Sequence, residues 1–301
     1  MSTYHIPALI TQSVEGLEIK PNGIYADLTF GGGGHSREIL ARLNQSGRLI
    51  AFDKDETAKQ NSIDDHRLIF ICHNFRFIYN FLKYLKLLPI DGILADLGVS
   101  SYHFDNPERG FSFRFDGKLD MRMNQKSTIT AQTVLNSYDE EKLTSLFKIY
   151  GEISSAKRLA QEIVRFRSEK PLETTTELKA IASKLAPSYD TARFLSQVFQ
   201  ALRIEVNSEL LALAEMLQAS VKVLKPGGRI AIISYHSLED RMVKYFFRTG
   251  DIKRSEPETD IYGKTTTPFN VITRKVIVPS EDEINKNPRI RSAKLRIAEK
   301  F

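Results

Sequence analysis

The sequence contains a single cysteine, no tryptophan and no apolar run long enough to cross a membrane. One cysteine, Cys72, excludes internal disulfides and a zinc site built from cysteines, and we predict no metal site. Its place in an apolar run predicts a small buried strand residue. Neither a signal peptide nor an internal repeat is found, so we expect a cytoplasmic protein without a membrane partner.

The charge balance is mildly basic. The 301 residues carry 43 Lys and Arg against 37 Asp and Glu, a formal net charge of +6. This bias is compatible with a nucleic-acid partner without proving one. A hydrophobic content of 42% is typical of a globular protein, and the length suits one large domain or two smaller ones.

A glycine-rich segment near the start organises the chain: Asp27-Leu28-Thr29-Phe30-Gly31-Gly32-Gly33-Gly34-His35-Ser36. An apolar run precedes it, and a helical pattern follows it, with Ser36 as the expected N-cap. Strand, glycine turn and helix together predict a ligand site at the carboxyl end of the first strand. The spacing is not G-x-G-x-x-G, and Asp27 would repel a pyrophosphate and attract a cation, which favours S-adenosylmethionine. A turn without a ligand is the alternative, but four consecutive glycines are costly in a folded element.

Further apolar runs predict a doubly wound parallel sheet. Strands are expected at residues 48–53, 68–73, 91–96 and 229–234, and two late strands at 271–278 and 293–298 form an antiparallel edge. From 106 to 203 the alternation stops, and helices are expected at 139–150, 152–167, 175–185 and 191–204. Capping boxes begin at Ser137 and Thr174, and Asn207 is expected to cap a further long helix. These patterns predict an α/β protein with an inserted all-helical domain.

Acidic residues at the strand ends are the main site candidates. Asp53, at the end of the second strand, is placed to bind ribose hydroxyls. Asp96, at the end of the fourth, could bind a cofactor ammonium or the acceptor group, with Ser100 and Ser101 orienting the acceptor or merely forming a turn. Phe75 suits either an adenine face or the core, about equally.

Two more segments carry polar side chains. Residues 234–237 end the fifth strand at the same edge, but no Ser/His/Asp triad can be argued without geometry. In residues 108–123, aromatics alternate with arginines, which suits stacking on unpaired bases and gripping phosphate. A surface loop that packs its own aromatics is the alternative.

Together these segments resemble the bacterial ribosomal RNA small-subunit methyltransferase H (MraW) family. The matching stretches span nearly the whole chain in order: His5-x-Pro7, residues 27–36, 53–55, 91–101, 108–113, 119–123, 199–207, 236–241 and 287–292.

The resemblance implies a class I methyltransferase domain with a Rossmann-like sheet (residues 1–105 and 204–301) and an inserted helical substrate-recognition domain (residues 106–203). It implies methyl transfer from S-adenosylmethionine to the exocyclic N(4) amine of a cytidine in small-subunit (16S) ribosomal RNA. The substrate would be an assembled or late-assembling small subunit, and the number of subunits of the enzyme, a homodimer included, stays open.

By motif, the implied cofactor contacts are Gly33, Gly34, His35, Asp53, Phe75 and Asp96. His103 stands where the family usually has Gln, and we keep it in the cofactor site. Asp96, Ser100 and Ser101 are the implied catalytic residues, because the developing charge on the amine needs an acceptor. RNA contacts are assigned to Arg109, Arg114, Arg122 and Arg203.

Two other classes are weighed. A methyltransferase for another RNA or a small-molecule amine would share the cofactor site, but it would not need the basic aromatic loop or so large an insert. A non-enzymatic RNA-binding module would not need acids at three strand ends.

Overall fold

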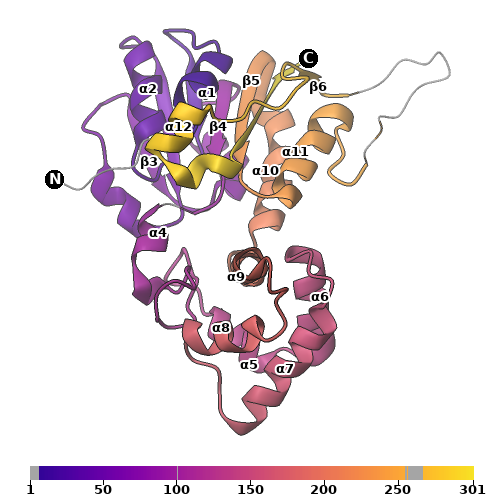
Figure 1. Ribbon diagram of the computed structural model, residues 1–301. Coiled ribbons are helices and arrows are strands. Elements are labelled where there is room, and N and C mark those ends of the chain that lie inside the picture. Colours follow the sequence, from indigo (N-terminus) through magenta and orange to yellow (C-terminus); the bar gives the residue numbers. More distant parts are fainter. Residues whose placement is uncertain (1–6, 100, 255, 257–266) are drawn as a thin grey trace. The chain divides into compact units, whose positions relative to one another are not determined.

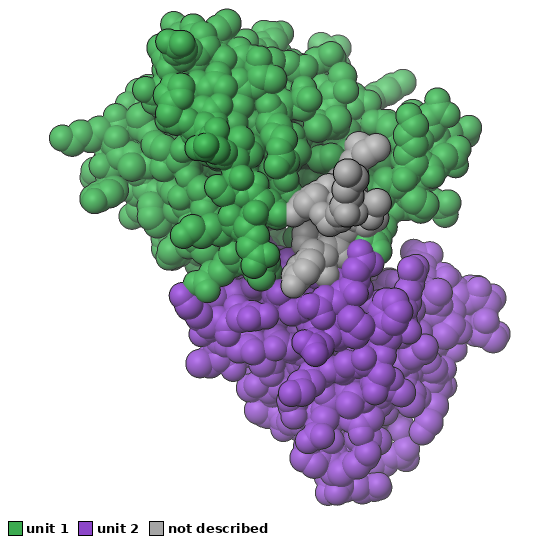
Figure 2. Space-filling view, turned by 90° about the vertical axis from the view of Figure 1, so that its left-hand side faces the viewer, with its two compact units in different colours: residues 1–98, 210–301 green, residues 99–209 purple. Residues whose placement is uncertain are grey.

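The computed structural model describes residues 7–99, 101–254, 256 and 267–301. The chain divides into two compact units, coloured green and purple in Figure 2. We call residues 1–98 and 210–301 the sheet unit, and residues 99–209 the helical unit. The domain boundaries predicted from the sequence, 106 and 203, fall inside the helical unit.

The sheet unit is built on a seven-stranded sheet of order β3-β2-β1-β4-β5-β7-β6. Its strands are β1 (Ile24–Asp27), β2 (Arg48–Asp53), β3 (Leu68–Cys72), β4 (Ile90–Asp96), β5 (Leu224–Ser234), β6 (Phe269–Val271) and β7 (Lys294–Lys300). Neighbours from β3 to β5 run parallel, whereas β7 is antiparallel to both β5 and β6. The predicted α/β fold with an antiparallel edge is therefore confirmed.

Helices cover both faces of this sheet (Figure 1). They are α1 (Ile10–Gly16), α2 (Gly34–Arg42), α3 (Ile78–Tyr84), α10 (Glu209–Val223), α11 (Ser237–Thr249) and α12 (Glu281–Lys286), with the 3₁₀ segments η1 (Glu56–Asn61), η2 (Phe75–Phe77) and η4 (Pro288–Ser292). Successive strand residues point to opposite faces, as the pleat requires. In β4, Leu94 packs with residues of α1 and α2, and Ala95 with residues of α3, α10 and α11.

Several local predictions in the sheet unit are wrong. Gly33, not Ser36, is the N-cap of α2, because the Ser36 hydroxyl bonds to a buried carboxylate instead. The first late strand is reduced to β6, three residues long. Cys72 is exposed rather than buried, since it ends β3, the outermost strand of the sheet.

The helical unit contains α4 (Ser101–Asp105), α5 (Ala131–Ser137), α6 (Glu140–Tyr150), α7 (Ala156–Glu169), α8 (Thr175–Ser183), α9 (Thr191–Asn207) and the 3₁₀ segment η3 (Pro107–Arg109). The capping box at Thr174 is present, but Asp139 rather than Ser137 caps α6. Leu143, Phe147, Leu159 and Leu202 are fully buried members of its own hydrophobic core.

Asn207 does not cap α10. It is the last residue of α9, and its side-chain amide donates to the Met121 carbonyl at 2.7 Å while its oxygen accepts from the Met123 N–H at 2.8 Å. The side chain therefore fastens the loop between η3 and α5 to α9. Among the described residues, no helix is both long and apolar enough to cross a membrane.

Candidate functional site

Three strands bring acidic residues to one edge of the sheet unit. In the parallel register Asp27 of β1 lies beside Ala51 of β2 and Leu94 of β4. Asp53 and Asp96 each end the neighbouring strand two residues further on. The carboxyl ends of β1, β2 and β4 thus form the edge at which ligands bind in such sheets.

The glycine turn follows β1 in a conformation that requires glycine. Gly33 has φ +76° and begins α2 as its N-cap. A Cβ on Gly34 would lie 2.2 Å from Cγ of Pro7. Glycine is thus required at Gly33 by the backbone conformation and at Gly34 by the close approach of Pro7.

The Asp27 carboxylate supports the glycine turn from inside the protein and does not face a ligand. It is fully buried, accepts a hydrogen bond from the Ser36 hydroxyl at 2.6 Å, and accepts another from the Thr29 N–H at 3.1 Å. Burial raises the pKa of its carboxyl to about 6. The interpretation of Asp27 as the acid that attracts a cation is therefore wrong, because its oxygens are turned inward.

Asp53 bridges the glycine turn and the segment after β2. Its Oδ2 accepts from the Gly31 N–H at 2.8 Å, and its Oδ1 accepts from the Asp55 N–H at 2.9 Å. Its side chain stays partly exposed, and each carboxylate oxygen can accept a further bond. The ribose contact of Asp53 stays a prediction, with an acid already held in place for it.

Asp96 lies in a small polar cluster at the end of β4. Its Oδ1 accepts from the Tyr235 hydroxyl at 2.8 Å, and its Oδ2 lies 3.9 Å from Nδ1 of His35. The side chain is 20% exposed, and burial raises its pKa to about 6. In its ionised form this carboxylate can accept a proton or a positive charge at the surface of the site.

His35 does not neutralise this carboxylate. It is buried, its Nε2 lies 3.2 Å from the Ala8 carbonyl, and burial lowers its pKa. The imidazole is thus neutral at pH 7 and contributes dipole and shape rather than charge.

Tyr235 is the member of the cluster that the sequence did not single out. Burial and the neighbouring Asp96 raise its pKa well above the usual value, so the phenol keeps its proton. The backbone N–H of Tyr235 donates a hydrogen bond to Oε2 of Glu239 at 2.9 Å. The only sequence signal was its position after the fifth strand, and its partner is 139 residues away in the chain.

The predicted cofactor and catalytic residues that remain are Ser100, Ser101, His103 and Phe75. Ser100 lies outside the described residues, and so does the side chain of Ser101, whose backbone begins α4. His103 belongs to the helical unit, where its ring lies 4.8 Å from that of Phe111. Phe75 begins η2 and packs partly buried against the core of the sheet unit.

Three of the four predicted RNA-binding arginines have partners inside the helical unit. Arg109 is buried and donates to the Arg122 carbonyl at 2.8 Å. Arg122 pairs with Asp120 at 2.8 Å, and Arg203 pairs with Glu209 at 3.0 Å. Arg114 is exposed, and its side chain has no partner among the described residues.

The arrangement fits S-adenosylmethionine. A glycine turn, an acid held at the end of β2 and a partly exposed acid at the end of β4 suit a ligand with hydroxyls and positive charge but no phosphate. The sheet order and this edge define a class I methyltransferase. The chain belongs to the MraW methylase family, which residues 2–301 match.

Relatives agree over the full length. Ribosomal RNA small subunit methyltransferase H of Bacteroides fragilis is 54% identical over 299 residues, 99% of this chain and 98% of that protein. The protein of the same name from Flavobacterium johnsoniae is 53% identical over 298 residues, again 99% and 98%. An rRNA methylase structure from Streptococcus thermophilus is 13% identical, covers 97% of this chain and 96% of its own, and has a TM-score of 0.42, which adds nothing further.

Proposed function

We propose that the protein transfers a methyl group from S-adenosylmethionine to the exocyclic N(4) amine of one cytidine in small-subunit ribosomal RNA. The observation that carries this proposal is the Asp96 carboxylate at the end of β4. It is held by Tyr235 and is one-fifth exposed at the ligand edge. The names of the full-length relatives support the ribosomal RNA substrate.

The chemistry asks for such a group. The amine of cytosine is conjugated with its ring, so its lone pair is a poor nucleophile, and positive charge develops on nitrogen as the methyl group arrives. S-adenosylmethionine supplies the electrophilic methyl when bound. Asp96 stabilises the charge and accepts the proton that the amine loses. Tyr235 holds the carboxylate in one orientation through its hydroxyl.

The cofactor contacts that we propose are Gly33, Gly34, His35, Asp53, Phe75, Asp96 and His103. Asp53 accepts hydrogen bonds from the ribose hydroxyls, and the glycine turn at Gly33 and Gly34 contacts the cofactor through its backbone. Ser100 and Ser101 orient the target amine.

For the RNA, we propose the helical unit as the recognition domain, with Arg114 as its first phosphate contact because its side chain is exposed and unpaired among the described residues. Arg109, Arg122 and Arg203 act by shaping the surrounding loop and α9 through their hydrogen bonds and ion pairs within that unit. The target base must leave its stack to reach the sheet edge. The substrate is a small subunit, assembled or late in assembly, and the protein works in the cytoplasm.

A comparison of substrates tests the proposal. The purified protein is incubated with methyl-labelled S-adenosylmethionine and, separately, naked small-subunit RNA, small ribosomal subunits and small amines. We expect label in the RNA of the first or second sample. Label only in small amines would replace the proposal by a small-molecule methyltransferase, and cofactor binding without any transfer would leave a binding protein.

A further inference from the structure

A second polar site lies in the sheet unit, at the strand edge opposite β3. It is a cavity of about 290 Å³ between α11, β6 and β7. Its lining has a shared character, with four cationic side chains and no acidic one: Lys244, Arg248, Arg274 and Arg296. We call it the basic pocket.

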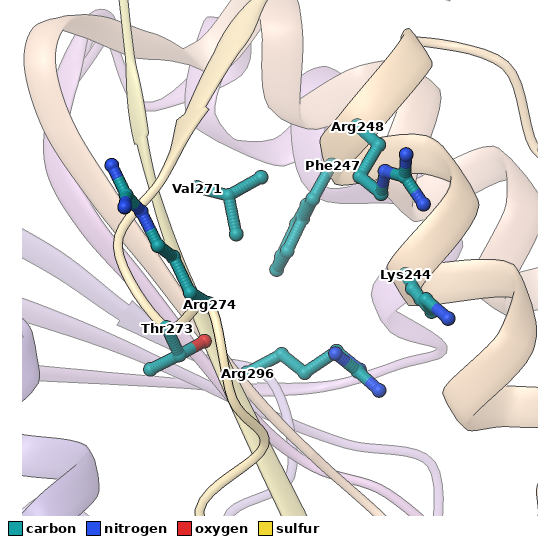
Figure 3. A pocket seen from close by; sticks show the side chains of 7 residues that line it. All are labelled: Lys244, Phe247, Arg248, Val271, Thr273, Arg274 and Arg296. Carbon is teal, nitrogen blue, oxygen red and sulfur yellow. The ribbon is translucent and has the colours of Figure 1, made fainter. Parts of the chain in front are cut away.

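The four cations come from three different elements. Lys244 and Arg248 are four residues apart on α11 and so share one helical face. Figure 3 shows them on one side of the pocket and Arg274, which follows β6, on the other. Cationic side chains therefore line the cavity from two sides.

Three of these charges have no counterion in the part of the chain that the structure describes. Lys244, Arg248 and Arg274 are exposed, and none of them has a side-chain partner among the described residues. Arg296 forms two hydrogen bonds with Asp240, at 2.7 and 3.2 Å, and Lys294 lies 3.6 Å from the same carboxylate. The pocket therefore keeps a strong excess of positive charge that an anion would neutralise.

The floor between the charges is apolar. Phe247 and Val271 lie between the cationic walls (Figure 3), and Phe247 is otherwise buried against the ring of Phe269 at 5.7 Å. Apolar floor and cationic rim together suit a nucleotide, whose sugar and base tolerate apolar contact while its phosphate needs cations.

The pocket lies on the α11 side of the sheet, and the strand register relates one of its residues, Arg296, to the reaction edge. Arg296 lies opposite Ile232 of β5, which in turn lies opposite Ala95, the residue before Asp96. Adjacent strands are about 4.8 Å apart, so two strand spacings, roughly 10 Å, separate the two backbones. S-adenosylmethionine carries no phosphate, so the pocket calls for a different ligand.

We propose that the basic pocket binds a backbone phosphate of the substrate RNA, a few nucleotides from the target base. This proposal rests on the proposed function, since it takes RNA as the substrate. It gives the sheet unit an RNA contact of its own, in addition to those proposed for the helical unit.

The test neutralises the pocket and measures the salt dependence of RNA binding. The variant carries Lys244→Gln, Arg248→Gln and Arg274→Gln. Its matched control carries Lys83→Gln, Lys86→Gln and Lys222→Gln, three exposed lysines of the same unit near the starts of β4 and β5. Affinity for transcribed small-subunit RNA is measured over a salt series, and binding of S-adenosylmethionine and of tripolyphosphate by calorimetry.

We expect the slope of log affinity against log salt to shrink by about 0.7 in the pocket variant, because the protein no longer binds the one phosphate that the pocket holds. The control should keep the wild-type slope, and both variants should bind the cofactor as the wild type does. Equal slopes in the pocket variant and the wild type, or an equal loss in the control, would overturn the proposal. If the pocket variant loses tripolyphosphate binding but keeps the salt slope of RNA binding, the proposal is also overturned, and the pocket is a site for free anions instead.

The two proposals fail differently. If the wild type methylates small-subunit RNA and the pocket variant keeps the wild-type salt slope, only the proposal for the basic pocket is refuted. If the wild type does not bind this RNA, both the proposed function and the proposal for the basic pocket are refuted.

Discussion

Replacing Tyr235 by Phe tests the role of Asp96 through the pH dependence of methylation. The change removes one hydroxyl, which donates to Oδ1 of Asp96 at 2.8 Å, and leaves the ring in place. That hydrogen bond favours the charged carboxylate and so lowers its pKa against the larger effect of burial, which raises it to about 6. Without the hydroxyl, the carboxyl should hold its proton to higher pH.

The magnitude follows from the strength of the bond. A hydrogen bond to a charged acceptor contributes about 1.5–3 kcal/mol, and one pH unit corresponds to about 1.4 kcal/mol. Asp96 works as an acceptor when ionised, so kcat/KM of the wild type should fall as the pH drops through about 6. In Tyr235→Phe the same fall should begin about one to two pH units higher, with the plateau at high pH largely retained.

The assay is kcat/KM for methylation of small ribosomal subunits from pH 5 to about 9, with Tyr245→Phe as the control. Tyr245 lies on α11, and its hydroxyl has no partner among the described residues, so its removal should leave the profile unchanged. An acid limb at the same pH in Tyr235→Phe and the wild type would refute the role of the phenol. A wild-type profile that is flat through pH 6 would remove Asp96 as the acceptor.

Three further predictions concern the cofactor, the loop and the RNA. Asp53→Ala should weaken S-adenosylmethionine binding by about 2–4 kcal/mol, on the order of 30- to 1,000-fold, because the two charge-assisted hydrogen bonds proposed between Asp53 and the ribose hydroxyls are removed. Calorimetry measures this affinity. Gly110→Ala should destabilise the protein by more than about 2 kcal/mol in chemical unfolding, because φ is +69° and the new Cβ would lie 2.1 Å from the Lys118 carbonyl oxygen. Arg114→Gln should reduce the salt slope of RNA binding by about 0.7 without changing stability.

Each of these has its own control and its contrary result. A folded Asp53→Ala protein with wild-type affinity would remove Asp53 from the site. Gly227→Ala matches Gly110→Ala, because φ is +73° there but no heavy atom lies within 4 Å of the added Cβ; equal losses in the two would deny the clash. Lys83→Gln is the charge control for Arg114→Gln. An unchanged salt slope of RNA binding in Arg114→Gln would mean that Arg114 is an exposed side chain without an RNA contact.

Periodicity predicted the sheet well because a buried strand needs a run of apolar residues whatever its neighbours are. The span 48–53 of β2 was predicted to the residue. β5 begins earlier than predicted, at Leu224, since the Lys225-Pro226-Gly227-Gly228 stretch that usually ends an element is accommodated by a shift in register between β4 and β5.

The candidate site was predictable where its residues are close in sequence and not where they are distant. The strand-end acids Asp53 and Asp96 follow from the strand pattern alone. Asp27 follows the same pattern, yet it is buried by Ser36, whose hydroxyl the sequence assigned to a helix cap. Tyr235 meets Asp96 only through the pairing of β4 with β5, which no local pattern encodes.

The position of the transferred methyl group tests the central claim most directly. Small ribosomal subunits that lack the modification are incubated with the protein and S-adenosylmethionine that carries an isotopically labelled methyl group. Their RNA is digested to nucleosides and fragments for mass spectrometry. The proposed function predicts one labelled methyl group per RNA, on the exocyclic N(4) amine of a single cytidine, and none with Asp96→Ala. Label on a ring carbon, on a ribose or on another base would contradict it.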